Sequence, residues 1–109
     1  MQIKARAMAS SIKARTKLEE GITTVRLLVR HPMESGNRKN PAGQSIPAHY
    51  IKELVCEHNG KPVLTAYWGP GISRDPYLSF RLAGVKAGDI LTIRWEDNQG
   101  QRDSLEIRT

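Results

Sequence analysis

Apolar and polar residues alternate along most of this chain, which is the pattern of strands with one buried and one solvated face. In "SIKARTKL", for example, Ile12, Ala14 and Leu18 share one face while Lys13 and Arg15 share the other. No segment keeps an apolar period of about 3.6 residues for long enough to predict a helix. The pattern predicts strands within residues 11–18, 23–31, 49–59, 61–68, 77–83, 89–97 and 102–108.

Turn residues separate these predicted strands. Asn59-Gly60 lies between two apolar runs and predicts a hairpin, because both central positions of such a turn need a positive φ. Further turns are predicted at Glu20-Gly21, from Gly84 to Gly88 and from Asn98 to Gly100. Short alternating strands with regular turns predict an all-β fold, an immunoglobulin-like β-sandwich of about seven antiparallel strands. The Cys…Trp…Cys pattern of antibody domains is absent, so this prediction concerns architecture only.

The two predicted strands between residues 50 and 68 depart from the alternation, because they carry apolar side chains on both faces. A two-layer sandwich covers only one face of each sheet by itself, so we expect a partner chain to cover the other. A β-bulge that shifts the register, or a long loop folded over the sheet, would explain the same pattern. The residues expected at the partner interface are Ile51, Leu54, Val55, Val63, Tyr67 and Trp68.

Length and composition fit one small domain. For a chain of 109 residues we predict a sandwich domain over residues 11–109 and a flexible amino-terminal tail over residues 1–10. No apolar run is long enough for a membrane span, and the amino-terminal residues lack the apolar core of a secretory signal. The formal net charge of +6 would attract acidic proteins, nucleic acid or anionic surfaces.

Candidate metal ligands are few. His31, Met33, Cys56 and His58 resemble the inventory of a blue-copper site. In such sites the cysteine, a histidine and the methionine usually lie close together near the carboxyl end, whereas here Met33 precedes Cys56. We therefore expect no metal and no cofactor, with Cys56 packed as a small apolar residue. A lone cysteine also excludes an internal disulfide.

Signatures of catalysis and of nucleic-acid binding are equally weak. The sequence has no nucleophile elbow and no phosphate loop, and the paired carboxylates Glu96 and Asp97 are interpreted as solvated turn charges, so we expect no enzyme. A groove for nucleic acid would interleave basic residues with exposed aromatic side chains. Most of the few aromatic residues, including Phe80 and Trp95, are predicted to lie in the core instead.

The longest interruption of the strand pattern runs from Arg30 to Ile51 and is rich in proline and glycine. Loops beyond roughly 12–15 residues are usually functional or disordered. Together with "WGPGISRDPY" at 68–77, this loop is interpreted as a recognition surface on a rigid scaffold, with an ordinary crossover connection as the alternative. The residues expected to take part in recognition are His31, Met33, Arg38 and Lys39, the last two either steering an acidic partner or serving as solvated charges.

The same loop and its neighbours carry a resemblance to a known family. The segments "HPMESGNRKN", "IPAHYI", "GPGISRDPYLSF" and "AGDILTIRWEDNQG" are similar to those of SoxZ sulfur-oxidation proteins. The resemblance extends from about Ser11 to Thr109. One departure is Asp75, where the family pattern leads us to expect asparagine, and it bears only on the local turn.

This resemblance implies a non-catalytic subunit that forms a heterodimer with a SoxY carrier, whose carboxyl-terminal cysteine holds the sulfur intermediate of thiosulfate and sulfur oxidation. It further implies a periplasmic protein exported with its partner, without a signal peptide of its own, and transient contacts with other Sox enzymes. Neither nucleic acid nor membrane is expected as a partner. The isolated chain is expected to self-associate, because its apolar face lacks a cover. The alternative interpretation is a small basic metal- or nucleic-acid-binding β-domain.

Overall fold

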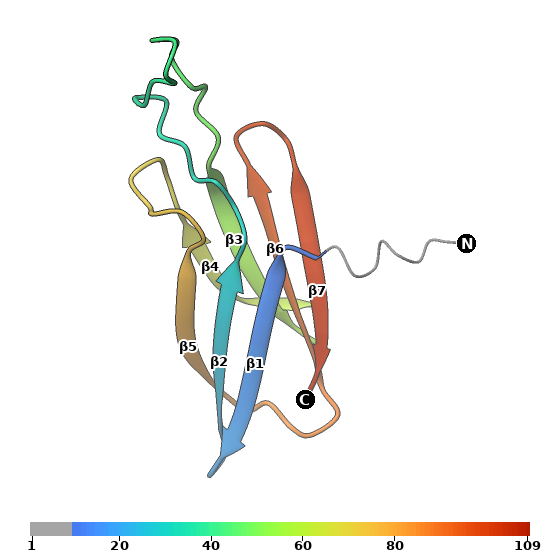
Figure 1. Ribbon diagram of the computed structural model, residues 1–109. Coiled ribbons are helices and arrows are strands. Elements are labelled where there is room, and N and C mark those ends of the chain that lie inside the picture. The colour runs from blue at the N-terminus through green and yellow to red at the C-terminus, as the bar shows by residue number, and fades with distance from the viewer. Residues whose placement is uncertain (1–9) are drawn as a thin grey trace, which may run out of the picture.

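Two antiparallel sheets face each other in this protein, and every described element is a strand (Figure 1). A computed structural model describes residues 10–109. Its strands are β1 (Ile12–Glu19), β2 (Ile22–Val29), β3 (Ile51–His58), β4 (Lys61–Tyr67), β5 (Tyr77–Ala83), β6 (Ile90–Asp97) and β7 (Arg102–Arg108). The prediction of an all-β sandwich of seven antiparallel strands is confirmed. Across residues 10–109 no helix is long and apolar enough to cross a membrane.

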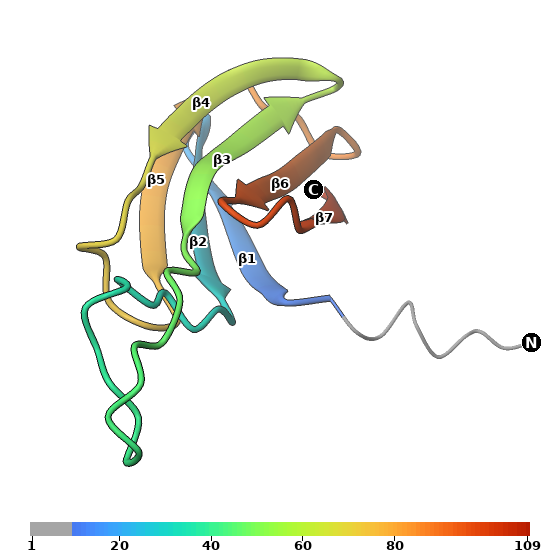
Figure 2. The same ribbon diagram turned by 90° about the horizontal axis from the view of Figure 1, so that it is seen from above.

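One sheet has the order β1-β2-β5 and the other the order β4-β3-β6-β7. The fourth strand thus pairs with β3. In the constant-type immunoglobulin order, the fourth strand would instead pair with the fifth. The connection from β4 to β5 therefore crosses between the sheets on one side of the sandwich, and the two strands lie on that side in both views (Figure 2).

Two tight hairpins confirm the predicted turns. Glu20 and Gly21 have φ values of 49° and 80°, and Asn59 and Gly60 have values of 49° and 85°. Positive φ at both central positions matches the right-handed twist of the flanking strands. Each hairpin has a two-residue loop, because Glu19 pairs with Ile22 and His58 pairs with Lys61.

The core lies between the sheets and is built from the alternate residues of each strand. On β2, the residues Val25, Leu27 and Val29 are fully buried, while Arg26 and Leu28 between them are exposed. Central strands β3 and β6 contribute most of the opposing layer. Its fully buried aliphatic and sulfur side chains are Ile51, Leu54, Cys56, Leu91 and Ile93.

A β-bulge explains much of the two-sided apolar pattern of β3. The register of β3 against β6 shifts between Ile51 and Glu53, so Ile51 joins Leu54 in the core despite their odd spacing. Val55 is the one apolar side chain left on the outer face of β3, and it is only 5% exposed within the chain itself. The register shift accounts for Ile51, and the chain itself covers Val55, so the pattern of β3 alone does not require a partner.

The two long edges of the sandwich differ. At the closed edge, β1 and β7 contact each other across the sheets. The Ser11 amide and hydroxyl donate to Asp103 Oδ2 at 2.6 and 2.7 Å, and Trp95 Nε1 donates to Ser11 Oγ at 2.9 Å. At the open edge, formed by β4 and β5, no backbone hydrogen bond joins the two strands in residues 10–109. The inward-facing side chains there are only partly buried, namely Leu64, Ala66, Trp68, Leu78, Phe80 and Leu82.

Residues 1–9 lie outside the described part of the chain, and most of the predicted tail over residues 1–10 lies there with them. Ser10 is the exception. Its hydroxyl donates to Asp103 Oδ2 at 3.4 Å and accepts from the Ile12 amide at 3.2 Å, so it belongs to the closed edge.

Candidate functional site

The long loop between β2 and β3 projects beyond the strand ends as an irregular two-armed ribbon (Figures 1 and 2). Its arms are paired near the base, where Glu34 and His49 exchange backbone hydrogen bonds of 2.7 and 2.9 Å. They pair again further out, where the Ile46 amide donates to the Arg38 carbonyl at 2.8 Å. At the tip, Asn40 Oδ1 accepts from the Ala42 and Gln44 amides at 2.9 and 3.0 Å. The loop is thus hydrogen-bonded to itself over most of its length.

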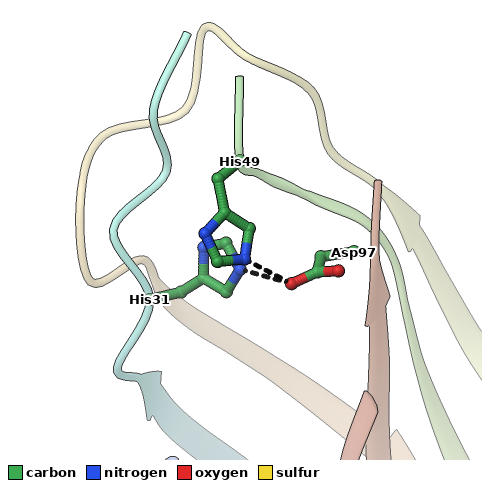
Figure 3. Close-up of side chains that lie close together, drawn as sticks. All are labelled: His31, His49 and Asp97. Carbon is green, nitrogen blue, oxygen red and sulfur yellow. Dashed lines mark hydrogen bonds and ion pairs between the residues drawn. The ribbon is translucent and has the colours of Figure 1, made fainter. Parts of the chain in front are cut away.

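Both arms converge on one carboxylate at the base of this loop. His31 Nε2 lies 3.0 Å from Asp97 Oδ2, and His49 Nε2 lies 2.8 Å from the same oxygen (Figure 3). His31 comes from the outgoing arm, His49 from the returning arm and Asp97 from the end of β6. The two imidazole rings meet edge to face with centroids 4.6 Å apart. We call these three side chains the His–Asp cluster.

Asp97 is fully buried, and its carboxylate is saturated with hydrogen bonds. Oδ1 accepts from the Gln99 and Gln101 amides at 2.9 and 2.8 Å, while Oδ2 accepts from the two histidines. Burial alone would raise the pKa of Asp97, but the hydrogen bonds from His31, Gln101, His49 and Gln99 together outweigh it and hold the pKa below its usual value. The buried carboxylate is therefore ionised, and it joins the loop to the β6–β7 hairpin.

The hydrogen bonds of His31 determine its tautomer. Its Nδ1 accepts from the Met33 amide at 3.1 Å, so a neutral ring carries its proton on Nε2 and donates it to Asp97. Histidines that bind metals usually donate their second nitrogen to an oxygen, which leaves the coordinating lone pair free. His31, His49 and Asp97 have the composition of a metal site, with ligand atoms within 4.8 Å of one another. The acceptor role of Nδ1 in His31 favours a hydrogen-bonded cluster over metal coordination.

The base of the loop also contacts the second loop. The His31 amide donates to Asp75 Oδ1 at 2.9 Å, and the Asp75 amide donates to the His31 carbonyl at 3.0 Å. Asp75 adopts a φ of 52°, a conformation that aspartate and asparagine tolerate better than most residues. Since asparagine offers the same Oδ1 acceptor, the departure from the family pattern at this position preserves the contact.

The structure divides the four predicted recognition residues into two pairs. His31 and Met33 are buried at the base of the loop, where Met33 Sδ lies 3.4 Å from the Ile51 amide. Neither side chain presents a surface to a partner, so the role predicted for these two is corrected to one of anchoring. Arg38 and Lys39 are exposed further along the loop.

Arg38 is committed to a partner within the loop. Its guanidinium donates to both carboxylate oxygens of Glu34, with Nε to Oε1 at 3.1 Å and Nη2 to Oε2 at 2.6 Å. This hydrogen bond lowers the pKa of Glu34 and raises that of Arg38. Lys39 makes no ion pair within residues 10–109, and its role in steering a partner stays a prediction.

The predicted interface residues also fall into two groups. Ile51 and Leu54 are fully buried and face the core, so they cannot contact a partner directly, and Val55, on the outer face of β3, is nearly buried as well. Val63 and Tyr67, on the outer face of β4, are 42% and 79% exposed, and Trp68 is partly buried just after that strand. The prediction of an interface therefore rests on β4 and the open edge.

The residues of the copper inventory have separate roles. Cys56 lies in the middle of β3 between Leu64 and Ile93, and burial, with a smaller contribution from the charge of Glu57, raises its pKa to about 11. Such a thiol is a poor nucleophile at neutral pH. His58 instead pairs with Asp89 at 2.7 Å, and this hydrogen bond is the largest cause that lowers the pKa of Asp89 to about 2.

Sequence reasoning missed two members of the His–Asp cluster. It gave His49 no role and interpreted Asp97 as a solvated turn charge, whereas Asp97 is fully buried. One signal was present: Asp97 continues the inward-facing series Leu91, Ile93 and Trp95, so the alternation places its side chain inside. A charged residue at an inward position needs partners, and histidines at both ends of the long loop were the available ones.

The chain is thus a small immunoglobulin-like sandwich with a long, self-paired loop anchored on a buried carboxylate. A family model described as "Sulphur oxidation protein SoxZ" matches residues 12–108. The chain therefore belongs to the SoxZ family and is a subunit of the Sox sulfur-oxidation system, which confirms the resemblance seen in the sequence. Comparison with curated proteins finds no significant match.

Proposed function

We propose that this chain is the non-catalytic subunit of a SoxYZ sulfur-carrier complex. In this role it holds a SoxY-like subunit whose carboxyl-terminal cysteine carries the sulfur intermediate of thiosulfate oxidation. Membership of the SoxZ family supports the proposal. The proposal includes a periplasmic location, export together with the partner and transient contacts with the other Sox enzymes.

The chemistry of the chain itself supports a non-catalytic role. The cysteine is a buried thiol whose pKa is raised to about 11, so it does not supply the thiolate that a sulfur carrier needs. The His–Asp cluster is occupied by its own hydrogen bonds, and His31 is buried beneath the loop. A carrier cysteine would therefore come from the partner.

The open edge is the single observation that carries the proposed pairing. Leu64, Phe80 and Leu82 point toward the core but remain only partly buried, because β4 and β5 do not close over them. Val63 and Tyr67 extend this apolar surface onto the outer face of β4. Since β4 is also an unpaired edge strand, its free backbone groups are available to a second chain. Permanent partners usually bury large apolar surfaces of this kind.

The test is co-expression of this chain with a SoxY-like subunit, followed by measurement of the affinity of the purified pair. We expect Val63→Glu and Tyr67→Glu each to weaken the complex roughly tenfold or more, because each places a charge in an apolar contact. Ser104→Glu, which introduces the same charge on exposed β7, is the control and should leave the affinity unchanged. Equal affinity for all three variants would show that the open edge does not bind the partner.

A further inference from the structure

The outer face of the β1-β2-β5 sheet is covered with positive charge. Its cross-strand rows are Lys13–Leu28–Tyr77, Arg15–Arg26–Ser79 and Lys17–Thr24–Arg81. We call the five cations Lys13, Arg15, Lys17, Arg26 and Arg81 the basic face, and all five are exposed. Glu19 is the one carboxylate on the outer face of these strands, and it pairs loosely with Lys17 at 3.6 Å.

The centre of the basic face holds an unfavourable pair. Arg15 and Arg26 stand directly opposite each other on neighbouring strands. Like charges in this position destabilise a sheet. No carboxylate within residues 10–109 pairs with either arginine, and residues 1–9 contain no acidic side chain that could do so. Folding therefore gives no reason for these two guanidinium groups to lie side by side.

The outer face of the other sheet is arranged differently. There, Arg94 pairs with Glu57 at 3.3 Å and Arg102 pairs with Glu96 at 3.6 Å. Positive charge on that face is thus largely neutralised by its own neighbours, although the two faces belong to one small sandwich. The excess charge of the protein is concentrated on the β1-β2-β5 side.

We propose that the basic face is a second docking surface, which binds an acidic surface of another protein. Carboxylates of the partner would lie over the Arg15–Arg26 pair and relieve its repulsion. Leu28 and Tyr77, 38% and 61% exposed, lie beside Lys13 in the first row, and Ile22, 38% exposed, lies beyond the last row, so apolar contacts border the charges at both ends of the basic face. This surface is distinct from the open edge, and the inference does not depend on the proposed pairing.

A protein fits this face better than a nucleic acid does. Single strands bind where several aromatic side chains can stack successive bases, whereas the basic face has only Tyr77. Duplex DNA is usually read by an element that enters a groove, and this surface is the broad side of a sheet. Charge at a protein–protein contact mainly accelerates association and makes it salt-dependent, which suits a short-lived encounter.

The full chain can be tested with poly-L-glutamate as a probe of acidic polypeptide surfaces. We expect the affinity to fall roughly fivefold or more in Arg15→Glu and less than about twofold in Lys61→Glu. Lys61 begins β4 on the other sheet and is exposed, so its variant changes the net charge equally. Raising the ionic strength from 0.01 to 0.15 M should weaken binding, since the screening length falls from about 30 to about 8 Å.

Arg15→Glu should also change the melting temperature of the chain, in the direction opposite to its effect on binding. Because Glu at position 15 would face Arg26, the repulsion becomes an attraction and the melting temperature should rise while binding falls. Amide shifts in an NMR titration with the probe should map to β1, β2 and β5.

Three outcomes would overturn the proposal. The first is equal weakening by Lys61→Glu, which would mean that only net charge matters. The second is tighter binding of a single-stranded DNA oligonucleotide, or of vesicles containing phosphatidylglycerol, than of poly-L-glutamate at the same salt. The third is a set of amide shifts centred on the tip of the long loop.

Discussion

The two long edges of this sandwich border the same core, but only one of them covers it completely. At the closed edge, polar side chains bind segments that lie far apart in the sequence, as Asp103 does with Ser11. At the open edge, Leu64 and Phe80 remain only partly buried, and β4 and β5 belong to different sheets. The sandwich therefore covers its core with its own residues at the closed edge, but leaves part of the core exposed at the open edge. The partly buried carboxylate of Asp103 stabilises the closed edge, and apolar surface remains for a partner at the open edge.

The largest loss of stability is expected away from both edges, at Asp97, which ties the long loop to the β6–β7 hairpin at one end of the molecule. Asp97→Ala should lower the free energy of unfolding by about 3–5 kcal/mol, because it leaves two histidines and two backbone amides without their acceptor. Urea denaturation measures this loss. Glu96→Ala, which removes only the surface pair with Arg102, should cost less than about 1 kcal/mol. Similar losses in the two variants would contradict the anchoring role of Asp97.

Removal of the carboxylate at the closed edge should have the next largest effect. Asp103→Ala deletes the acceptor of the Ser11 amide and hydroxyl, and we expect a loss of about 1.5–3 kcal/mol in the free energy of unfolding. Hydrogen exchange should show faster opening at the start of β1, with little change in β4. Protection lost equally on both sides of the sandwich would mean that the edges are not independent.

Protonation of the same carboxylates in acid should lower the free energy of unfolding by less than their removal does. Burial raises the pKa of both Asp97 and Asp103, but hydrogen bonds outweigh it and hold each pKa below the usual 3.8. A carboxylate with a lowered folded pKa stabilises the protein above the unfolded pKa, and this contribution is lost as the pH falls through the folded value. Stability should therefore decrease below about pH 4. An Asp97→Asn variant followed by circular dichroism should show a shallower decrease, and an unchanged slope would speak against this origin.

The smallest loss in the isolated chain is expected at the open edge. Leu64→Ala should cost about 1–2 kcal/mol, against about 2–5 kcal/mol for Leu91→Ala in the closed interior, because Leu64 is already partly exposed. Thermal unfolding of the chain alone and of its complex with a SoxY-like subunit measures this cost in both states. If a SoxY-like subunit covers Leu64, the cost of the substitution should grow in the complex. A cost that stays the same would place the partner elsewhere.

Much of this architecture follows from local rules that a sequence displays. The strict alternation in β2 and β6 and the positive φ demanded by Asn59-Gly60 fix strands and hairpins without knowledge of tertiary structure. The bulge in β3 does not follow, because a register shift depends on how the neighbouring strand pairs. Nothing local predicts that β4 joins β3 in a four-stranded sheet, and so the open edge is a property of topology.

The His–Asp cluster illustrates the same limit. Its members are separated by up to 66 residues, and each looks unremarkable in its own segment. The long loop around His31 marks it as a candidate for recognition, but its burial and its bond to Asp97 depend on tertiary structure. The inward alternation of β6 was the one clue, and it needed the observation that a charge cannot lie at such a position unpaired.

The anchored base of the long loop has a consequence for how the protein can be altered. Since both arms are fastened at His31 and His49, the outer part of the loop, from Arg38 to Ile46, makes its hydrogen bonds within the loop rather than with the sandwich. Doubling the length of a flexible loop costs only about 0.6 kcal/mol of extra closure entropy. The tip around Asn40 is therefore a natural point of insertion, where an epitope or a second binding peptide can be grafted while the rest of the molecule folds as before.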